Sequence, residues 1–168
     1  MPRIVLHQPR IPPNTGNVAR TCAATRSELH LIEPLGFQID DRHLRRAGLD
    51  YWAAVQVKVH PSDDSFLRWR SARGGRLLAF SSHAVRSYTD CRFAASDWLL
   101  FGREDTGLPE DLRQQADGFL TIPMPGGRGR SGGIVRSLNL SVAVGVVVFE
   151  ALRQLEEGDN RGVGPHPL

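Results

Sequence analysis

This 168-residue chain has little cysteine, one lysine and no long apolar run. Its two cysteines, Cys22 and Cys91, are too few for a disulfide framework or a metal cluster, which favours a reducing cytoplasm. The longest apolar stretch, residues 142–149, is far shorter than the ~20 residues that span a bilayer. The opening MPRIVLHQPR lacks the long apolar core of a signal peptide. We therefore expect a cytoplasmic protein that needs neither a membrane nor a metal.

The scarcity of lysine leaves a positive charge made almost wholly of arginine. Lys58 is the only lysine, whereas the other 20 of the 21 basic residues are arginines. Coding bias in a GC-rich genome explains most of such an imbalance, but the arginine side chain is also a planar fork that binds phosphate. Because the formal net charge is only +3, the positions of the arginines must decide between these explanations.

Strand-like and helix-like segments alternate along the chain, which is typical of an α/β domain with a mostly parallel sheet. The length suits one domain, which we place at residues 1–156, and the Gly/Pro-rich residues 157–168 are expected to form a disordered tail. Apolar and β-branched runs predict strands at 4–7, 29–34, 55–60, 76–82, 98–102 and 118–124. Caps and amphipathic spacing predict helices at 14–25, 40–48, 62–72, 109–116 and 139–156.

Ligands of parallel sheets bind beyond the carboxyl ends of the strands, so the loops that follow strands are candidate sites. In the first, QPRIPPNTGN (8–17), Pro12 and Pro13 predict an extended entry to a helix capped by Asn14 or Thr15. Asn17 and Arg20 are three residues apart and so share one helix face. Taken alone, this loop is better explained as a capped helix that carries an incidental arginine.

The second candidate loop, GREDTGLPE (102–110), places two glycines around Glu104. Gly102 ends an apolar strand, where backbone often passes close to a ligand. The simpler alternative is an ordinary strand–turn–helix connection, with Pro109 as the first residue of the helix. The spacing does not match a dinucleotide fingerprint or a phosphate-binding loop, and we rank a nucleotide-binding oxidoreductase last for that reason.

The third candidate loop, PGGRGRSGGIVRSLNLS (125–141), contains five glycines and three arginines. It is either a flexible surface loop or a cofactor and phosphate loop. Ser137, Asn139 and Ser141 can cap the helix that follows or bind a ligand. In that helix every residue from 142 to 149 is apolar or glycine, so we expect it to be buried on all sides. We favour a contact with a second subunit through Val144 and Val148.

Together these loops resemble the motifs of the SPOUT superfamily of trefoil-knot methyltransferases, in particular its small tRNA ribose 2′-O-methyltransferases of the TrmL type. The first motif is IVLHQPRIPPNTGNVARTCAAT, the second FGREDTGLP, and the third IPM with SLNLSVAVGVVVFEALRQL. The segment LHLIEPLGFQIDDRHLRRAGLDYW is the most diagnostic of the small subgroup. The resemblance covers roughly residues 3–156.

The resemblance implies a SPOUT fold with a C-terminal trefoil knot, a homodimer, and S-adenosylmethionine as cofactor. The reaction would be methylation of the ribose of the wobble nucleotide of tRNA, C or U at position 34. The cofactor-binding residues would be Phe80, Gly102, Glu104, Ile122, Met124, Ser137 and Leu138. The catalytic residues would be Arg20, Asn17, Ser137 and Asn139, and tRNA would be bound by Arg42, Arg45, Arg46, Arg128, Arg130 and Arg136.

Two features depart from the family pattern. The linker between IPM and SLNLS is short in compact members, whereas here it carries additional glycines and arginines. We interpret it as the cofactor-side knot loop, lengthened so that its arginines meet RNA phosphate. Phe149 stands where members often have tyrosine, so any role of that hydroxyl is absent from this chain.

The family places Arg20 nearest to the attacking hydroxyl, but a guanidinium stays protonated at neutral pH and has no free lone pair. We therefore expect Arg20 to clamp the adjacent phosphate and to stabilise the developing alkoxide, while a phosphate oxygen or water takes the proton. Two alternatives stay open. One is an rRNA ribose methyltransferase, although larger relatives of that kind commonly add an RNA-binding domain. The other is a non-catalytic RNA-binding protein on the same scaffold.

Overall fold

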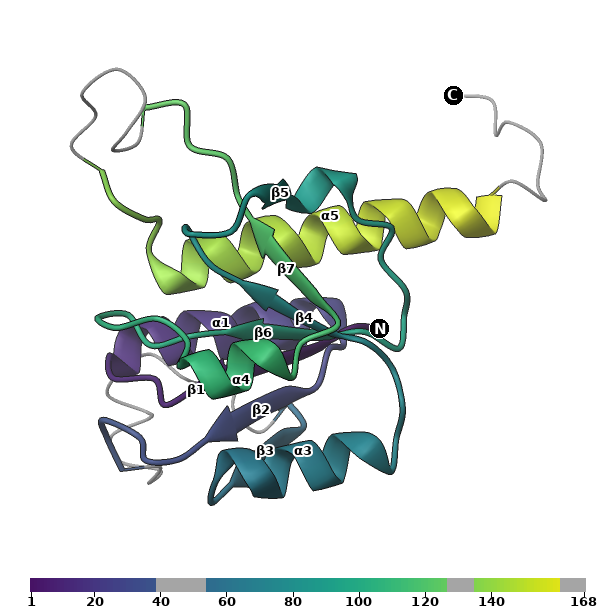
Figure 1. Cartoon of the computed structure of the whole chain (residues 1–168). Helices are drawn as coiled ribbons and strands as arrows, with labels where there is room; N and C mark the ends of the chain where they lie inside the picture. The colour runs from purple at the N-terminus through teal and green to yellow at the C-terminus, as the bar shows by residue number, and fades with distance from the viewer. Residues whose placement is uncertain (39–53, 127–134, 161–168) are drawn as a thin grey trace.

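The computed structural model describes residues 1–38, 54–126 and 135–160. Its centre is a seven-stranded sheet with the strand order β3-β2-β1-β6-β4-β7-β5 (Figure 1). Each neighbouring pair in this sheet is parallel, which confirms the predicted mostly parallel arrangement. The strands are β1 (Arg3–His7), β2 (Leu29–Ile32), β3 (Val57–His60), β4 (Leu77–Phe80), β5 (Arg86–Ser87), β6 (Trp98–Phe101) and β7 (Gly118–Thr121).

Helices cover both faces of the sheet (Figure 1). The helices are α1 (Pro12–Thr25), α3 (Asp63–Ser71), α4 (Glu110–Gln114) and α5 (Leu140–Asn160). α1 and α5 pack on one face, where their apolar side chains join a single core cluster with β1, β2, β4 and β6. α3 and α4 bury Phe66 and Leu112 on the other face. Strands buried on both faces explain why β2, β4 and β6 are wholly apolar or nearly so.

Several short elements and helix ends in the structure differ from those predicted. The short strand β5 and the 3-10 turn Tyr88–Asp90 were not predicted, because a two-residue strand has no periodicity to detect. Pro109 precedes α4 as its N-cap and is not its first residue. The predicted helix at 40–48 lies outside the described residues. α5 continues to Asn160, beyond the predicted end at 156.

The start of α1 differs most from the prediction. The helix begins at Pro12, so Pro12 and Pro13 occupy its first turn instead of an extended entry. A missing N–H costs nothing there, and the fixed φ of proline suits the helix. Its N-cap is Ile11, which makes no side-chain cap, so the expectation that Asn14 or Thr15 caps the helix was wrong. By contrast, Ser62 caps α3 as the sequence suggests, accepting from the Ser65 N–H at 3.2 Å.

α5 has two different faces, which corrects the expectation that it is buried on all sides. Val144 and Val148 are fully buried in the protomer's own core, so they cannot form the predicted subunit contact. Val142 and Phe149 instead are 50% and 57% exposed. With 3.6 residues per turn, positions 142, 145 or 146, and 149 form one stripe. No helix of the described part is long and apolar enough to cross a membrane.

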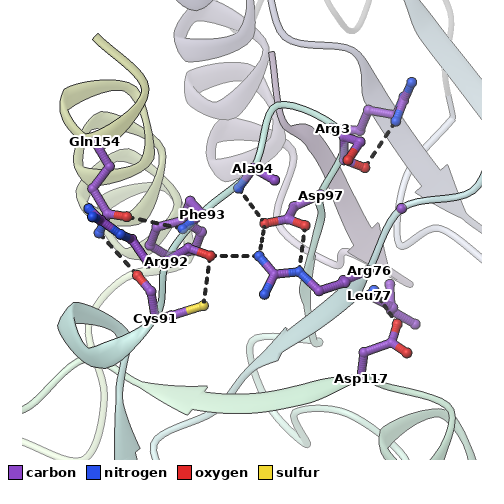
Figure 2. A network of polar contacts seen from close by, with 12 residues as sticks. Arg3, Arg76, Leu77, Cys91, Arg92, Phe93, Ala94, Asp97, Asp117 and Gln154 are labelled. Carbon is purple, nitrogen blue, oxygen red and sulfur yellow. Dashed lines mark hydrogen bonds and ion pairs between the residues drawn. The ribbon is translucent and has the colours of Figure 1, made fainter. Parts of the chain in front are cut away.

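The middle of α5 is held to the segment before β6 by a polar network (Figure 2). Gln154 accepts from the Phe93 N–H at 3.0 Å and donates to the Cys91 carbonyl at 3.1 Å. Asp97, which is fully buried, accepts two hydrogen bonds from Arg76, at 3.0 and 2.7 Å. Because a buried carboxylate is costly unless paired, these contacts fix the 91–97 segment against both the sheet and α5.

Candidate active site

A cavity of about 620 Å³ lies at the carboxyl ends of β4, β6 and β7. Such a volume is typical of pockets for small molecules and cofactors, and the position is the usual one in a parallel sheet. Phe80 and Phe101, the last residues of β4 and β6, stack with ring centroids 4.8 Å apart. They form an apolar floor beneath loops that are richer in polar groups.

The loop after β6 closes on itself. Arg103 and Gly107 exchange two backbone hydrogen bonds, of 3.1 and 3.0 Å. A Cβ atom on Gly102 would lie 2.3 Å from the carbonyl carbon of Gly107, so glycine is required there by the loop itself. The prediction had attributed this glycine to the approach of a ligand. Hydrogen bonds from Arg103 lower the pKa of Asp105 to about 2, which keeps this loop carboxylate ionised.

Glu104 points from the same loop to the start of α1. Its carboxylate accepts from the Arg10 N–H at 2.9 Å, the Ile11 N–H at 3.2 Å and the Asn14 side-chain amide at 3.1 Å. It therefore supplies, from 90 or more residues away, the cap that the residues beside α1 do not provide. A carboxylate at a helix N-terminus also interacts favourably with the helix dipole.

The network continues from α1 to α5. Asn14 accepts from the Asn139 side-chain amide at 2.9 Å. Asn139 is the N-cap of α5, and its oxygen accepts from the backbone N–H of Ser141 at 2.9 Å and from its hydroxyl at 2.7 Å. Glu104, Asn14 and Asn139 thus connect the three candidate loops in one chain of hydrogen bonds. The predicted capping role of Asn139 is confirmed.

The importance of Asn14 was missed in the sequence, where this residue was considered only as a cap. Its amide is the central link, since it donates to Glu104 and accepts from Asn139. The signal available in the sequence was an asparagine directly after two prolines that can themselves begin the helix; the structure then shows that this asparagine is buried, 5% exposed. Amide groups that are buried normally have hydrogen-bond partners, so a burial pattern would have pointed to a partner from another loop.

All seven predicted cofactor-binding residues line the cavity: Phe80, Gly102, Glu104, Ile122, Met124, Ser137 and Leu138. Asn139 and Arg136 line it as well. Asn17 and Arg20 do not line the cavity but lie on the exposed side of α1, and Arg20 takes part in polar contacts. Arg20 is six residues after Asn14, about 9 Å along the helix axis. The other predicted RNA-binding residues, Arg42, Arg45, Arg46, Arg128 and Arg130, lie outside the described residues.

Other side chains complete the cavity wall without having been predicted. Ser81, Ser82 and His83 follow β4, and Thr106 and Arg113 come from the loop after β6 and from α4. Within the described ranges no group of three His, Cys, Asp or Glu side chains gathers as a metal site. The cavity therefore offers hydroxyls, amides and arginines around apolar walls, a set suited to a nucleoside-like ligand and an adjoining phosphate.

Comparison with known proteins agrees with this geometry. Residues 1–149 match the SpoU rRNA methylase family. A protein of a Polaromonas species, named tRNA (cytidine(34)-2'-O)-methyltransferase, is 49% identical over 153 residues, which cover 90% of this chain and 89% of that protein. A protein of Burkholderia ambifaria with the same name is 44% identical over 151 residues, covering 90% and 94%.

Solved structures show the same similarity. One, from a study of the 2-OH methylation of C/U34 on tRNA, has a TM-score of 0.83 and 50% sequence identity, and the match covers 92% of this chain and 96% of that one. Another is an AdoMet-bound rRNA methyltransferase from Sinorhizobium meliloti, with a TM-score of 0.79 and 27% identity. That match covers 91% of this chain and 56% of the other.

Proposed function

Because the chain belongs to the SpoU rRNA methylase family, we propose that it is an S-adenosylmethionine-dependent RNA ribose 2′-O-methyltransferase. Its substrate is the wobble nucleotide of tRNA, C or U at position 34. The observation that carries this proposal is that three loops distant in sequence meet at one cavity, tied by Glu104, Asn14 and Asn139. Near-full-length similarity to tRNA enzymes favours tRNA over rRNA as the substrate.

The cavity fits S-adenosylmethionine in size and lining. Phe80, Ile122 and Leu138 offer apolar surface for an adenine ring, while Ser137 and the backbone after Gly102 offer polar groups. When bound, the cofactor supplies an electrophilic methyl group. The remaining work belongs to the chain: the ribose hydroxyl must be aligned with that methyl group, and a well-aligned pair of reactants can lower the barrier by several kcal/mol.

We assign the alignment and charge stabilisation to Ser137 in the cavity lining and to two exposed residues of α1 outside it, Asn17 and Arg20. Arg20 holds the phosphate beside the target nucleotide and stabilises the developing alkoxide, while a phosphate oxygen or water accepts the proton. Asn17 and Ser137 orient the ribose or the methionine end of the cofactor. The amide of Asn139 is already engaged with Asn14 and Ser141, so its role is to position the third loop.

The finer features of the family belong to the same proposal. A C-terminal trefoil knot is supported by the position of β7, which lies between β4 and β5, two strands that precede it in the chain. Knotted chains are rare among proteins, so the knot stays part of the proposal. We also propose that residues 1–156 act as one domain, that the enzyme works in the cytoplasm, and that it is a homodimer. The exposed stripe of α5, which includes Val142, Gly145 and Phe149, is the proposed contact, since a Cβ on Gly145 would meet open space.

Arginines of the third loop would hold the tRNA backbone. Arg136 is exposed at the cavity, and Arg128 and Arg130 precede it in the chain. Replacing all three with glutamine should lower the slope of log affinity against log salt by roughly 0.7–0.9 for each lost phosphate contact. Cofactor affinity should change less. A loss of cofactor binding with unchanged tRNA binding would instead identify the loop as a lid over the cofactor.

Ribose-methylation mapping of tRNA from cells that lack this protein tests the function directly. We expect loss of the 2′-O-methyl group at position 34 of a subset of tRNAs, and its return with wild type but not with Arg20→Ala. Unchanged tRNA together with a lost rRNA methyl group would favour the rRNA alternative. Methylation that is intact in both pools would favour an RNA-binding protein without catalysis.

A further inference from the structure

A second cavity, of about 350 Å³, lies beside the first. Four residues of the loop after β6 line both cavities, so that loop is their shared wall. On its far side are the end of β1, the first turn of α3 and the residue before α4. The lining consists of His7, Gln8, Asp63, Arg103, Thr106, Gly107, Leu108 and Pro109.

Two polar side chains in this second cavity lack hydrogen-bond partners. His7 is 3% exposed, and both of its ring nitrogens are buried without a partner. Asp63 Oδ1 is buried and likewise has none. His7 Nε2 lies 3.3 Å from Asp63 Oδ1, so the two groups face each other in a contact that is poorly aligned for a hydrogen bond. Buried polar atoms in native proteins are almost always paired, so these atoms point to a molecule that completes them.

The charged groups nearby do not neutralise the Asp63 carboxylate. Burial lowers the pKa of His7, although the charge of Asp63 and its weak hydrogen bond to the ring oppose that shift, so the imidazole is neutral at pH 7 and leaves the charge of the carboxylate unbalanced. The guanidinium of Arg103 is engaged by Asp105 through two hydrogen bonds, of 2.9 and 2.8 Å. The Asp63 side chain is 37% exposed, so a ligand in the cavity can reach it.

The other lining residues indicate which kind of ligand could donate a hydrogen bond to Asp63. Leu108 and Pro109 give the cavity an apolar wall, Gln8 contributes an amide, and Thr106 contributes a hydroxyl. A carboxylate and an amide beside an apolar wall suit a planar heterocycle with an exocyclic amino group, as in adenine, guanine or cytosine. A carboxylate accepts such amino groups in nucleic-acid recognition, and unstacked RNA bases are bound by pockets of this kind.

We propose that this second cavity binds a nucleobase that neighbours the methylated nucleotide, and that Asp63 accepts a hydrogen bond from its exocyclic amino group. This inference rests on the proposed function, because it takes the RNA to enter through the first cavity. The shared loop would then separate the target nucleotide from the neighbour that is recognised. The protein would thus recognise the RNA through contacts on both sides of one loop.

The test uses anticodon stem-loop RNAs and the full-length protein loaded with S-adenosylhomocysteine for binding or S-adenosylmethionine for turnover. In each RNA one base near position 34 is replaced by an analogue without its exocyclic amino group, inosine for guanosine or nebularine for adenosine. Wild type should lose about tenfold to hundredfold in affinity and in kcat/KM at one neighbouring position, the range of a good base contact. Asp63→Asn should bind that analogue and the natural RNA nearly equally.

Asp64→Asn is the matched control, because Asp64 is exposed in the same first turn of α3 but does not line the cavity. It should discriminate as wild type does. If Asp63→Asn discriminates as strongly as wild type at every position, the second cavity does not read a base and the inference is wrong. Discrimination that depends on Asp63 without methyl transfer would uphold the inference while refuting the enzymatic function. Methyl transfer without such discrimination would refute the inference while upholding the enzymatic function.

Discussion

Removing the Glu104 carboxylate should loosen the start of α1 and misplace Arg20. Glu104→Ala leaves three donors without their acceptor: the N–H groups of Arg10 and Ile11 and the amide of Asn14. The two backbone donors are solvent-exposed and can turn to water, so each bond is worth about 0.5–1 kcal/mol, and the partly buried Asn14 bond about 1–1.5 kcal/mol. The lost charge at the helix N-terminus adds about 0.3–1 kcal/mol.

The total is about 3 kcal/mol in the free energy of unfolding. For a chain of this size each kcal/mol lowers Tm by about 2–4 °C, so differential scanning calorimetry should show a fall of about 6–12 °C. The Tm of Glu104→Gln should lie between those of wild type and Glu104→Ala. The amide keeps one oxygen that accepts hydrogen bonds, but its NH2 group then faces donors from which it cannot accept. At 25 °C both variants remain folded, which allows activity to be measured.

The rate of methyl transfer by Glu104→Ala should fall even though the variant stays folded. A displacement of about 1 Å at a reacting group can cost about a hundredfold in rate, and α1 carries Arg20 about 9 Å beyond Asn14. We expect kcat for methyl transfer to fall by about 10–100-fold in Glu104→Ala. Glu157→Ala is the control, since it removes an exposed ion pair with Arg153 that is worth at most about 1 kcal/mol, and neither residue lines the cavity. If Glu104→Ala matches this control in both Tm and kcat, Glu104 does not organise the site.

Three further predictions concern other parts of the molecule. Arg20→Ala should abolish methyl transfer with little change in cofactor affinity by calorimetry, while Arg20→Lys retains some activity; full turnover in Arg20→Ala would remove this residue from the mechanism. Val142→Asp combined with Phe149→Asp should give folded monomers by light scattering, whereas Val144→Asp should lower Tm sharply because it charges the core; an unchanged dimer mass in the double variant would place the interface elsewhere. The pKa of His60 is lowered to about 4, chiefly by burial, so the unfolded state binds the proton first as pH falls below 6.5. The free energy of unfolding should therefore drop by up to about 3 kcal/mol between pH 6.5 and 4, and a pH profile in His60→Gln as steep as that of wild type would contradict this assignment.

The sequence alone was sufficient for the parallel α/β sheet, because buried strands such as LLAF and WLLF and their alternation with helices are local signals. It was also sufficient to single out the three loops, since glycines and polar residues after strands mark ligand sites in this fold class. The matches to known proteins then agreed with the family expected from the motifs in those loops.

Only the tertiary structure decided which groups meet. Glu104 caps α1 from 90 or more residues away, and Asn139 reaches Asn14 across 125, distances at which neither propensity nor spacing carries information. The same limit applies to α5: an unbroken apolar run predicts burial, but which side faces the protomer's own core depends on how the helix rotates against α1 and the sheet. That rotation buried Val144 and left Phe149 exposed, because packing of complementary surfaces, which no local pattern encodes, sets the orientation of a helix.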